Sequence, residues 1–297
     1  MAVEICENFD IKNLTTFKTG GLIERVCFPK NIDEFLSIKP PYKVFGNLSN
    51  TLVSSSGYDG TIVLTSKMDN ITSIGTSITA GCGVKGPKLS QFAASKGLSG
   101  LEFMIGFPGS VGGEIFMNAS ANGQCISDCV KSVTLFCPEK GVFKLSRDEM
   151  EFEYRKSICQ RKNFIVLEVE FELSEDGTEK INDRMKKNLE FRKSHQPSLS
   201  LPNCGSIFKN PEGDSAGRLL DEVGAKSMNV GGAKVWENHA NFIVNPNGGS
   251  SLDILKLMCM MKNRVKEKFE INLYPEVLYL GNRNEEEENL CKILYQK

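Results

Sequence analysis

The 297-residue sequence has little of several things that particular classes of protein need. It has two histidines and one tryptophan, and its 36 basic and 37 acidic residues leave a net charge of -1. A nucleic-acid-binding face needs an excess of basic side chains, so this balance predicts no nucleic-acid partner. No stretch approaches the ~20 apolar residues of a membrane span, and we expect no membrane segment.

The first thirteen residues, MAVEICENFDIKN, lack the apolar core of a secretory signal, so we expect a cytoplasmic protein. Histidine is too scarce for an obvious zinc site, because only His195 and His239 could join the scattered cysteines as ligands. A zinc site needs about four converging ligands. We therefore predict no metal and interpret the ten cysteines, from Cys6 to Cys291, as reduced and mostly buried thiols.

Hydrophobic patterning predicts a mixed α+β chain. We expect strands at 25–28, 43–45, 61–64, 130–136 and 164–173, with short strands between 71 and 83. We expect helices at 31–38, 87–96 and 180–193, one capped by Asp214 and ended by Gly224, and one after the Ser250–Asp253 capping box. Residues 99–123 show no helical or strand period. The glutamates at 285–288 indicate a solvated or frayed tail.

The first chemical signal is the loop Gly46-Asn47-Leu48-Ser49-Asn50, which follows a predicted strand. Successive backbone N–H groups in such a turn can point at a phosphate, and the hydroxyl and amide side chains add donors. An ordinary surface turn is the alternative, because glycine, asparagine and serine are common in loops.

The second signal is the loop at 106–113, which holds four glycines and a proline in eight residues. Glycine allows the backbone to come close to something flat or bulky. Tight packing of two strands explains the same composition, and the spacing alone does not decide between the two explanations.

Seven motifs together resemble one family. They are Asn13-Leu14-Thr15-Thr16-Phe17 with Gly20-Gly21; Gly46–Asn50; Ser99–Phe103 with the Pro108–Gly113 loop and Asn118-Ala119; Tyr154-Arg155-Lys156-Ser157; Gly205–Pro211; His239–Phe242; and Tyr274–Val277. In this order they resemble the UDP-N-acetylenolpyruvoylglucosamine reductases, flavoenzymes of peptidoglycan synthesis. The resemblance runs from Asn13 to about Gly281.

The resemblance implies an α+β fold: an FAD-binding fold of the PCMH/vanillyl-alcohol-oxidase type in two subdomains, at 1–67 and 68–192, and a C-terminal α/β substrate-binding domain at 193–297. It implies that FAD lies with its diphosphate at the first loop and its ring near the second. The implied cofactor residues are Gly46, Asn47, Leu48, Ser49, Asn50, Thr51, Phe107, Pro108, Gly109, Ser110, Gly113, Asn118 and Ala119.

Leu48 departs from the family pattern, which has a glycine at this position. If the position needs a positive φ, leucine costs on the order of 1–2 kcal/mol there. The family's loop would then be strained in this chain, and its affinity for FAD could be lower.

The implied reaction is an NADPH-dependent reduction of UDP-N-acetylglucosamine enolpyruvate to UDP-N-acetylmuramate. The resemblance assigns Arg155 to the substrate carboxylate, Glu276 to the charge that develops there, and Ser206 to proton donation. It also places Tyr154, Lys209 and Asn210 at the substrate. Without the resemblance, Arg155 is a surface cation and Ser206 a turn residue.

Two questions stay open at this point. The chain is short between Arg155 and Phe164, as in the short-loop form of the family, so the sequence does not say what covers the substrate. Lys193 and His195 either meet the diphosphate or are solvated at a helix C-terminus.

Two rival functions are another flavoprotein of the same superfamily and a binding protein that has lost FAD.

Overall fold

The computed structural model describes residues 3–198 and 200–296. The described chain separates into two compact units. The first contains the residues up to Ile5, Cys27–Asn47 and Ile62–Arg192, and the second contains Cys6–Val26, Leu48–Thr61 and the residues from Lys193 onward. The division into three domains at 67 and 192 stays a prediction.

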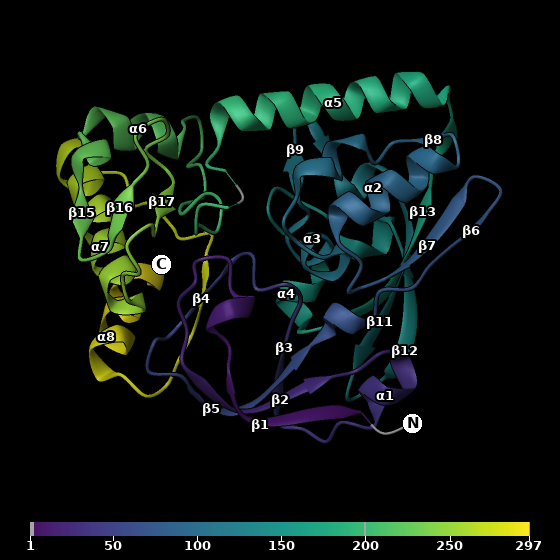
Figure 1. Ribbon diagram of the computed structural model, residues 1–297, viewed down its shortest axis with the longest axis horizontal. Helices are drawn as coiled ribbons and strands as arrows, with labels where there is room; N and C mark the ends of the chain where they lie inside the picture. Colours follow the sequence, from purple (N-terminus) through teal and green to yellow (C-terminus); the bar gives the residue numbers. More distant parts are fainter. Residues whose placement is uncertain (1–2, 199, 297) are drawn as a thin grey trace. The chain divides into compact units, whose positions relative to one another are not determined.

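The first unit is built on an antiparallel sheet of five strands, in the order β12-β11-β13-β7-β6 (Figure 1). Its strands are β6 (Ile71–Ile74), β7 (Ser77–Gly81), β11 (Val130–Cys137), β12 (Gly141–Ser146) and β13 (Ile165–Glu172). Alternate residues of the central strands enter the core, among them Val133, Leu135 and Val169. This alternation is the period-2 pattern of a sheet with one buried face.

The helices of the first unit are α1 (Ile32–Leu36), α2 (Gly86–Ser95), α3 (Val111–Met117) and α4 (Ile158–Lys162), and α5 (Thr178–His195) begins in it. Helix α2 begins with Pro87 in its first turn and is followed by Gly97 at a φ of +67°. Proline suits the first turn of a helix and glycine the left-handed position after its end. Helix α3 packs against β13 and β7.

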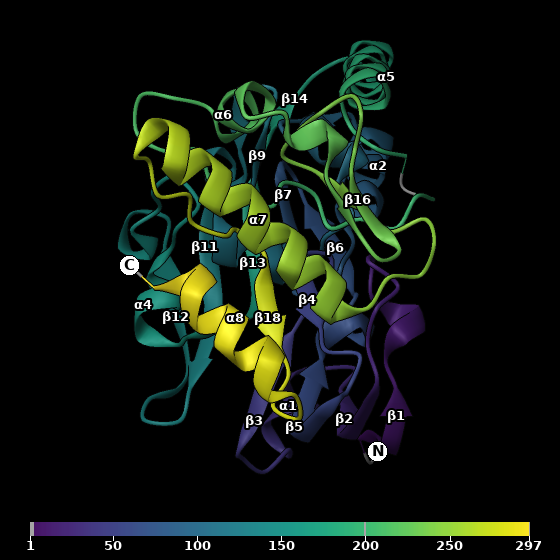
Figure 2. The same ribbon diagram turned by 90° about the vertical axis from the view of Figure 1, so that its left-hand side faces the viewer.

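Three helices dominate the second unit: α6 (Ala216–Glu222), α7 (Ser251–Phe269) and α8 (Glu285–Tyr295). Helices α7 and α8 lie side by side (Figure 2). A three-stranded sheet contains β15 (Asn229–Val230), β16 (Ala233–Val235) and β17 (Ile243–Val244), and the strands β4 (Thr51–Val53) and β18 (Leu278–Leu280) pair in parallel. The α7 residues Met258 and Met261 are fully buried, as predicted for core methionines.

The remaining strands form one four-stranded sheet and two pairs. Strands β1 (Glu4–Asp10), β2 (Leu22–Phe28), β5 (Tyr58–Leu64) and β3 (Tyr42–Phe45) form one sheet in that order; β8 (Leu98–Ser99) pairs with β14 (Ser174–Glu175), and β9 (Ser120–Ala121) with β10 (Gln124–Cys125).

Most of the predicted elements are confirmed, and the Ser250–Asp253 capping box begins α7 as expected. Two predictions are wrong. Ser215, not Asp214, caps α6, because the Asp214 carboxylate forms an ion pair with Arg218 instead. The glutamates at 285–288 are the first turn of α8 and not a frayed tail; Glu285 and Glu286 are exposed, as predicted, but Glu287 is 1% exposed.

The cysteines are as the sequence predicted. All ten are free thiols, and most of them are buried. Over the part of the chain that the structure describes, no helix has both the length and the apolar character needed to cross a membrane.

Candidate active site

The two glycine-rich loops meet in the first unit. A Cβ on Gly46 would lie 2.1 Å from the Ser110 hydroxyl oxygen, so any other residue at position 46 would displace that hydroxyl. The Asn47 side-chain amide donates a hydrogen bond of 3.5 Å to the Pro108 carbonyl. The Ser110 hydroxyl is buried and has no hydrogen-bond partner among the described residues. A buried polar group without a hydrogen-bond partner costs about 1–3 kcal/mol of stability. The two loops around the Ser110 hydroxyl therefore fit a polar ligand such as FAD.

The second loop runs alongside the segment that follows β7. Val111 N–H donates to the Val84 carbonyl and Gly112 N–H to the Cys82 carbonyl, both at 2.8 Å. A Cβ on Gly112 would lie 2.9 Å from the Cys82 Cβ. Tight backbone packing therefore accounts for Gly112, whereas Pro108 and Gly113 keep part of their surface accessible.

Leu48 has a φ of +52° and is 3% exposed. This is the left-handed conformation that the family's glycine implied, and a non-glycine residue adopts it at a cost of about 1–2 kcal/mol. The loop therefore keeps its path around a buried leucine. The hydroxyl of Thr16, from the first motif, donates a bond of 3.4 Å to the next carbonyl, that of Ser49.

Arg155 lies in a tight turn in which the main chains of Glu153 and Lys156 exchange two hydrogen bonds of 3.1 Å. Arg155 has a φ of +55°, and its Nη1 donates to the Ser120 hydroxyl at 3.0 Å. The guanidinium carbon lies 5.5 Å from the ring centroid of Tyr154, which is exposed. Backbone strain of this kind persists where the surroundings enforce it and is common at functional sites.

Asn118 joins the second loop to the Arg155 turn. It ends α3 at a φ of +43°, and its side-chain amide donates a bond of 3.0 Å to the Glu153 carbonyl. The next residue, Ala119, donates its N–H to the Glu114 carbonyl at 2.8 Å, and Ser120 follows directly. The first unit therefore brings the Asn118–Ala119 pair and Arg155 together.

Ser206 and Glu276 are brought together in the second unit. The N–H of Glu276 donates a hydrogen bond of 2.8 Å to the carbonyl of Ile207, the residue after Ser206. On the other side, Ile207 N–H donates to the Asn241 carbonyl at 2.9 Å. Three of the sequence motifs, around residues 206, 241 and 276, thus lie side by side.

The Glu276 carboxylate affects the segment that leads into Ser206. Burial and, after it, the charge of Glu276 raise the pKa of the Cys204 thiol well above its usual value. The carbonyl of Glu276 accepts a bond of 2.9 Å from the side-chain amide of Asn50. Gly205 has a φ of +81°, which lets the chain turn sharply just before Ser206.

The predicted substrate residues flank this arrangement. Lys209 N–H donates to the Tyr274 carbonyl at 2.9 Å, so the backbone of both motifs is paired there. The Asn210 side-chain oxygen accepts from Ala216 N–H at 3.0 Å and helps to begin α6. Lys193 and His195 are exposed at the C-terminal end of α5.

Asn241 and His239 stabilise this part of the unit. Both polar atoms of the Asn241 side chain bond to the Phe208 main chain, at 3.0 and 2.8 Å. The His239 ring accepts from Asn241 N–H at 3.1 Å and packs so close to Gly217 that a Cβ there would lie 2.8 Å from it. Burial lowers the pKa of His239, which fits a neutral, structural imidazole.

Sequence reasoning missed two groups beside the second loop. Glu114, in α3, is buried, neither carboxyl oxygen has a hydrogen-bond partner among the described residues, and burial raises its pKa to about 8. The Arg192 side chain lies against Gly106, where a Cβ would be 2.7 Å from its Cδ, and burial lowers the pKa of Arg192. Neither residue stands in a recognisable motif, so no local signal in the sequence identifies them.

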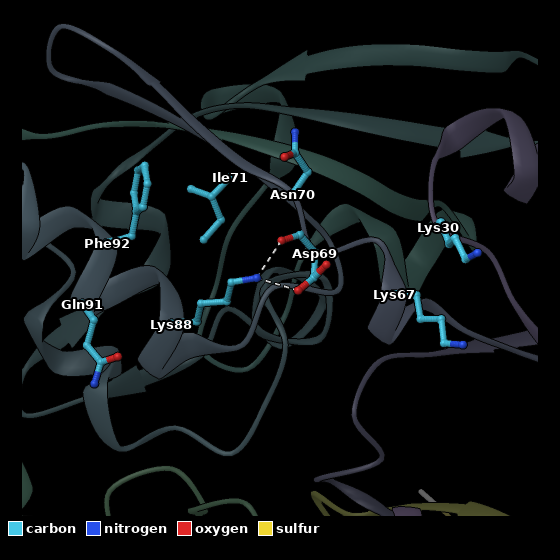
Figure 3. A pocket seen from close by; sticks show the side chains of 8 residues that line it. All are labelled: Lys30, Lys67, Asp69, Asn70, Ile71, Lys88, Gln91 and Phe92. Carbon is cyan, nitrogen blue, oxygen red and sulfur yellow. Dashed lines mark hydrogen bonds and ion pairs between the residues drawn. The ribbon is translucent and has the colours of Figure 1, made fainter.

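A separate pocket lies on the first unit (Figure 3). Its lining residues are Lys30, Lys67, Asp69, Asn70, Ile71, Lys88, Gln91 and Phe92. Two of its lysines are already paired with carboxylates: Lys88 with Asp69 and Lys67 with Glu4, each at 2.5 Å. None of the predicted cofactor residues lines it. Among the residues described, no three acidic, cysteine or histidine side chains are grouped as a metal site would require.

Two family models match the chain. A family model described as "FAD binding domain" matches residues 35–146, so the first part of the chain is an FAD-binding domain. A second, described as "UDP-N-acetylenolpyruvoylglucosamine reductase, C-terminal domain", matches residues 196–280.

Whole-chain relatives agree with these matches. The UDP-N-acetylenolpyruvoylglucosamine reductase of Bacillus licheniformis is 40% identical over 294 residues, covering 94% of this chain and 95% of the relative. That of Lactococcus lactis subsp. cremoris is 38% identical over 283 residues, covering 93% and 94%. The crystal structure of the Thermus caldophilus reductase has a TM-score of 0.81 and 34% identity, and the match covers 94% of this chain and 99% of that one.

The chain belongs to the UDP-N-acetylenolpyruvoylglucosamine reductase family. It is an FAD-dependent oxidoreductase with the predicted α+β, FAD-binding fold. The family resemblance stated from the sequence is thus confirmed, and the alternative of an FAD-free binding protein is not favoured.

Proposed function

We propose that this chain reduces UDP-N-acetylglucosamine enolpyruvate to UDP-N-acetylmuramate in peptidoglycan precursor synthesis, with NADPH as the hydride donor. The reaction follows from the names of its relatives. The observation that carries the residue assignment is the hydrogen bond of 2.8 Å from Glu276 N–H to the Ile207 carbonyl, which joins the Ser206 and Glu276 segments.

The cofactor residues of the two loops are assigned to FAD. In the first unit, Gly46 and Asn47 would line the diphosphate, and the buried hydroxyl of Ser110 would find its missing partner in the cofactor. Ser49, Asn50 and Thr51 continue the same loop into β4, while Phe107–Gly109, Gly113 and Asn118-Ala119 are assigned to the ring. When bound, the flavin supplies the hydride that NADPH has delivered.

Arg155 and Glu276 are assigned to the charge that forms as the substrate is reduced. The guanidinium is always charged, and its planar fork matches a carboxylate, so it binds the substrate carboxylate and stabilises additional negative charge on it. Glu276 is assigned to the same group, to which it donates a hydrogen bond only when its carboxyl group carries a proton. Ser120 and Tyr154 hold the Arg155 side chain at the head of its turn.

Ser206 is assigned as the donor of the proton to the carbon beside the carboxylate. A serine hydroxyl is a weak acid, so its alkoxide needs a cation or donors nearby. Lys209, three residues further on, is assigned to this charge and to the substrate, and its backbone is fixed by Tyr274. The side-chain nitrogen of Asn210 and the ring of Tyr154 are assigned to substrate contacts.

The proposed setting is the cytoplasm, without a nucleic-acid, membrane or metal partner. The near-neutral net charge supports the absence of a nucleic-acid partner. UDP-activated sugars and NADPH are metabolites of the cytoplasm, which supports the location.

The test is product analysis with the purified holoprotein. We expect one molecule of UDP-N-acetylmuramate for each NADPH consumed, identified by mass spectrometry. NADPH oxidation without this product would assign the protein to another substrate of the same superfamily. A colourless preparation that does not respond to added FAD would contradict the flavoenzyme assignment itself.

A further inference from the structure

The helix α8, whose first four residues were predicted to be solvated or frayed, is built into the second unit. It begins after Asn284, whose side chain accepts the N–H of Glu287 at 3.1 Å. Its last turn is fixed by the buried Lys262 of α7, which donates to the carbonyls of Leu294 and Ile293 at 2.8 and 3.2 Å. The region matched by the family model ends at residue 280, before α8.

Glu287 is 1% exposed, and its carboxylate accepts hydrogen bonds from three hydroxyl groups. It accepts from the Ser54 hydroxyl at 2.5 Å, from the Tyr279 hydroxyl at 2.7 Å and from the Ser251 hydroxyl. An isolated buried carboxylate costs several kcal/mol, and hydrogen bonds of this kind offset that cost. Burial, followed by the bond to Glu287, raises the pKa of Tyr279, so its hydroxyl keeps the proton that it donates.

Gly281 leaves the space that this contact needs. A Cβ at position 281 would lie 2.3 Å from the Tyr279 hydroxyl oxygen and 2.6 Å from the Ser54 Cβ. Any other residue would separate Tyr279 and Ser54, the two donors to Glu287.

A second contact comes from the other end of α8. The Tyr295 hydroxyl donates a bond of 2.6 Å to the carbonyl of Val277, the residue after Glu276. Burial raises the pKa of Tyr295, so this hydroxyl is also a donor at neutral pH.

These contacts reach two paired strands that carry parts of the active site. Leu278 N–H donates to the Asn50 carbonyl at 2.9 Å and Ser54 N–H to the Leu280 carbonyl at 2.8 Å, at the two ends of the β4–β18 pair. Glu276 precedes β18 and Asn50 precedes β4. Through Val277, Tyr279 and Ser54, the helix thus holds both strands.

We infer that α8 is a positioning element for Glu276, and that Tyr295 and Glu287 are its positioning residues. The inference rests on the proposed function, in which Glu276 acts on the substrate. A displacement of about 1 Å at a reacting group can cost about 10²-fold in rate. Because Glu276 is assigned to substrate reduction, loosening α8 slows that half-reaction and spares the reduction of the flavin by NADPH.

The test measures the two half-reactions separately by stopped-flow absorbance in the FAD-loaded protein. We expect Tyr295→Phe and Glu287→Gln each to slow flavin re-oxidation by UDP-N-acetylglucosamine enolpyruvate about tenfold. A tenfold change in rate corresponds to the net free energy of about one hydrogen bond. Flavin reduction by NADPH should stay within about twofold of the wild type, because Glu276 is assigned to the reduction of the substrate and not to that half-reaction. Glu285→Gln, an exposed change on the same helix, is the matched control and should alter neither rate.

Two results would overturn the inference. One is re-oxidation by both variants at the wild-type rate, and the other is an equal slowing of both half-reactions, which indicates general loosening of the fold. Should Glu287→Gln fail to fold, Tyr295→Phe, which removes a single oxygen, decides alone. A wild-type protein that the enolpyruvate does not re-oxidise would instead refute the proposed function, so the two failures are distinguishable.

Discussion

The side-chain amide of Asn50 donates a hydrogen bond of 2.9 Å to the main-chain carbonyl of Glu276. Asn50 closes the loop assigned to the FAD diphosphate, and Glu276 is assigned to the substrate. The parallel pairing of β4 with β18 continues directly from this bond. One short piece of sheet in the second unit therefore sets the position of Asn50 relative to Glu276.

Ser206→Ala should separate the two halves of the reaction. Loss of a proton donor lowers a rate by about 10²–10⁴-fold, so substrate turnover falls by that factor while NADPH still bleaches the flavin. Steady-state and single-turnover absorbance measure both. Ser227→Ala, an exposed serine of the same unit bonded to the Gly224 carbonyl, is the control and should be close to the wild type. Equal loss of both half-reactions in Ser206→Ala would mean that the serine is structural.

Arg155→Lys should lower kcat/KM for the enolpyruvate even though lysine keeps the positive charge. Lysine keeps the charge but lacks the planar fork, so we expect about 10²-fold lower kcat/KM for the enolpyruvate. Ser120→Ala removes the hydroxyl that holds Arg155 and should cost about five- to tenfold. Ser120 is expected to act only by holding Arg155. A larger loss of kcat/KM in Ser120→Ala than in Arg155→Lys would contradict this expectation.

At position 48, glycine should give a more stable protein than alanine, which is the reverse of the usual order. Both substitutions remove the buried side chain, but only glycine also relieves the left-handed backbone at a φ of +52°. We expect Leu48→Gly to have a free energy of unfolding about 1 kcal/mol higher than that of Leu48→Ala. Urea denaturation of the two variants measures the difference, and a more stable alanine variant would show that the loop changes its path.

Glu114 should make stability depend on pH. Burial raises its pKa from an ordinary value of 4.5 to about 8 in the folded state. Between these values the unfolded chain releases the proton that the folded chain keeps, so this group's contribution is complete below about pH 4.5 and is lost as the pH rises through about 8. When the pKa of a group differs by one between the folded and unfolded chains, stability changes by about 1.4 kcal/mol.

Glu114→Gln keeps the shape and cannot ionise, so it isolates this contribution. We expect the free energy of unfolding of the wild type to fall more steeply with pH than that of Glu114→Gln between pH 5 and 8. Urea titrations at several pH values test this. Parallel curves for the two proteins would show that Glu114 is ionised, and hence solvated, in the folded state.

The elements that the sequence predicts best have their signals within a few residues. Helix α2 has Pro87 at one end and Gly97 at the other, and α7 has the Ser250–Asp253 capping box. These signals act through local backbone geometry and caps, so they hold whatever the rest of the chain does.

The elements that it predicts poorly depend on distant partners. Helix α3 contains Gly112 and Gly113 in its first turn, each costing about 1 kcal/mol relative to alanine, and its start is held by bonds to Cys82 and Val84. The burial of Glu287 depends on Ser54, 233 positions earlier in the chain. Charge alone indicated solvent for that residue.

In the candidate site, too, the sequence predicts some residues, whereas others depend on partners that are distant in the chain. Motif order identified the family, and with it Arg155, Ser206 and Glu276. The contacts that hold these residues come from Ser120, Asn241 and Asn50, which only the fold brings near. Glu114 is one of 37 acidic residues, and its isolation from every polar partner that the structure describes cannot be read from its neighbours in sequence.

In the proposed reaction this flavoprotein passes reducing equivalents to UDP-N-acetylglucosamine enolpyruvate. Its most direct test is anaerobic: the purified, FAD-loaded protein is bleached with one equivalent of NADPH, and the enolpyruvate is then added without oxygen. We predict that the visible flavin absorbance returns in full and that UDP-N-acetylmuramate appears in equal amount. A flavin that stays bleached until oxygen is admitted would refute the proposed function.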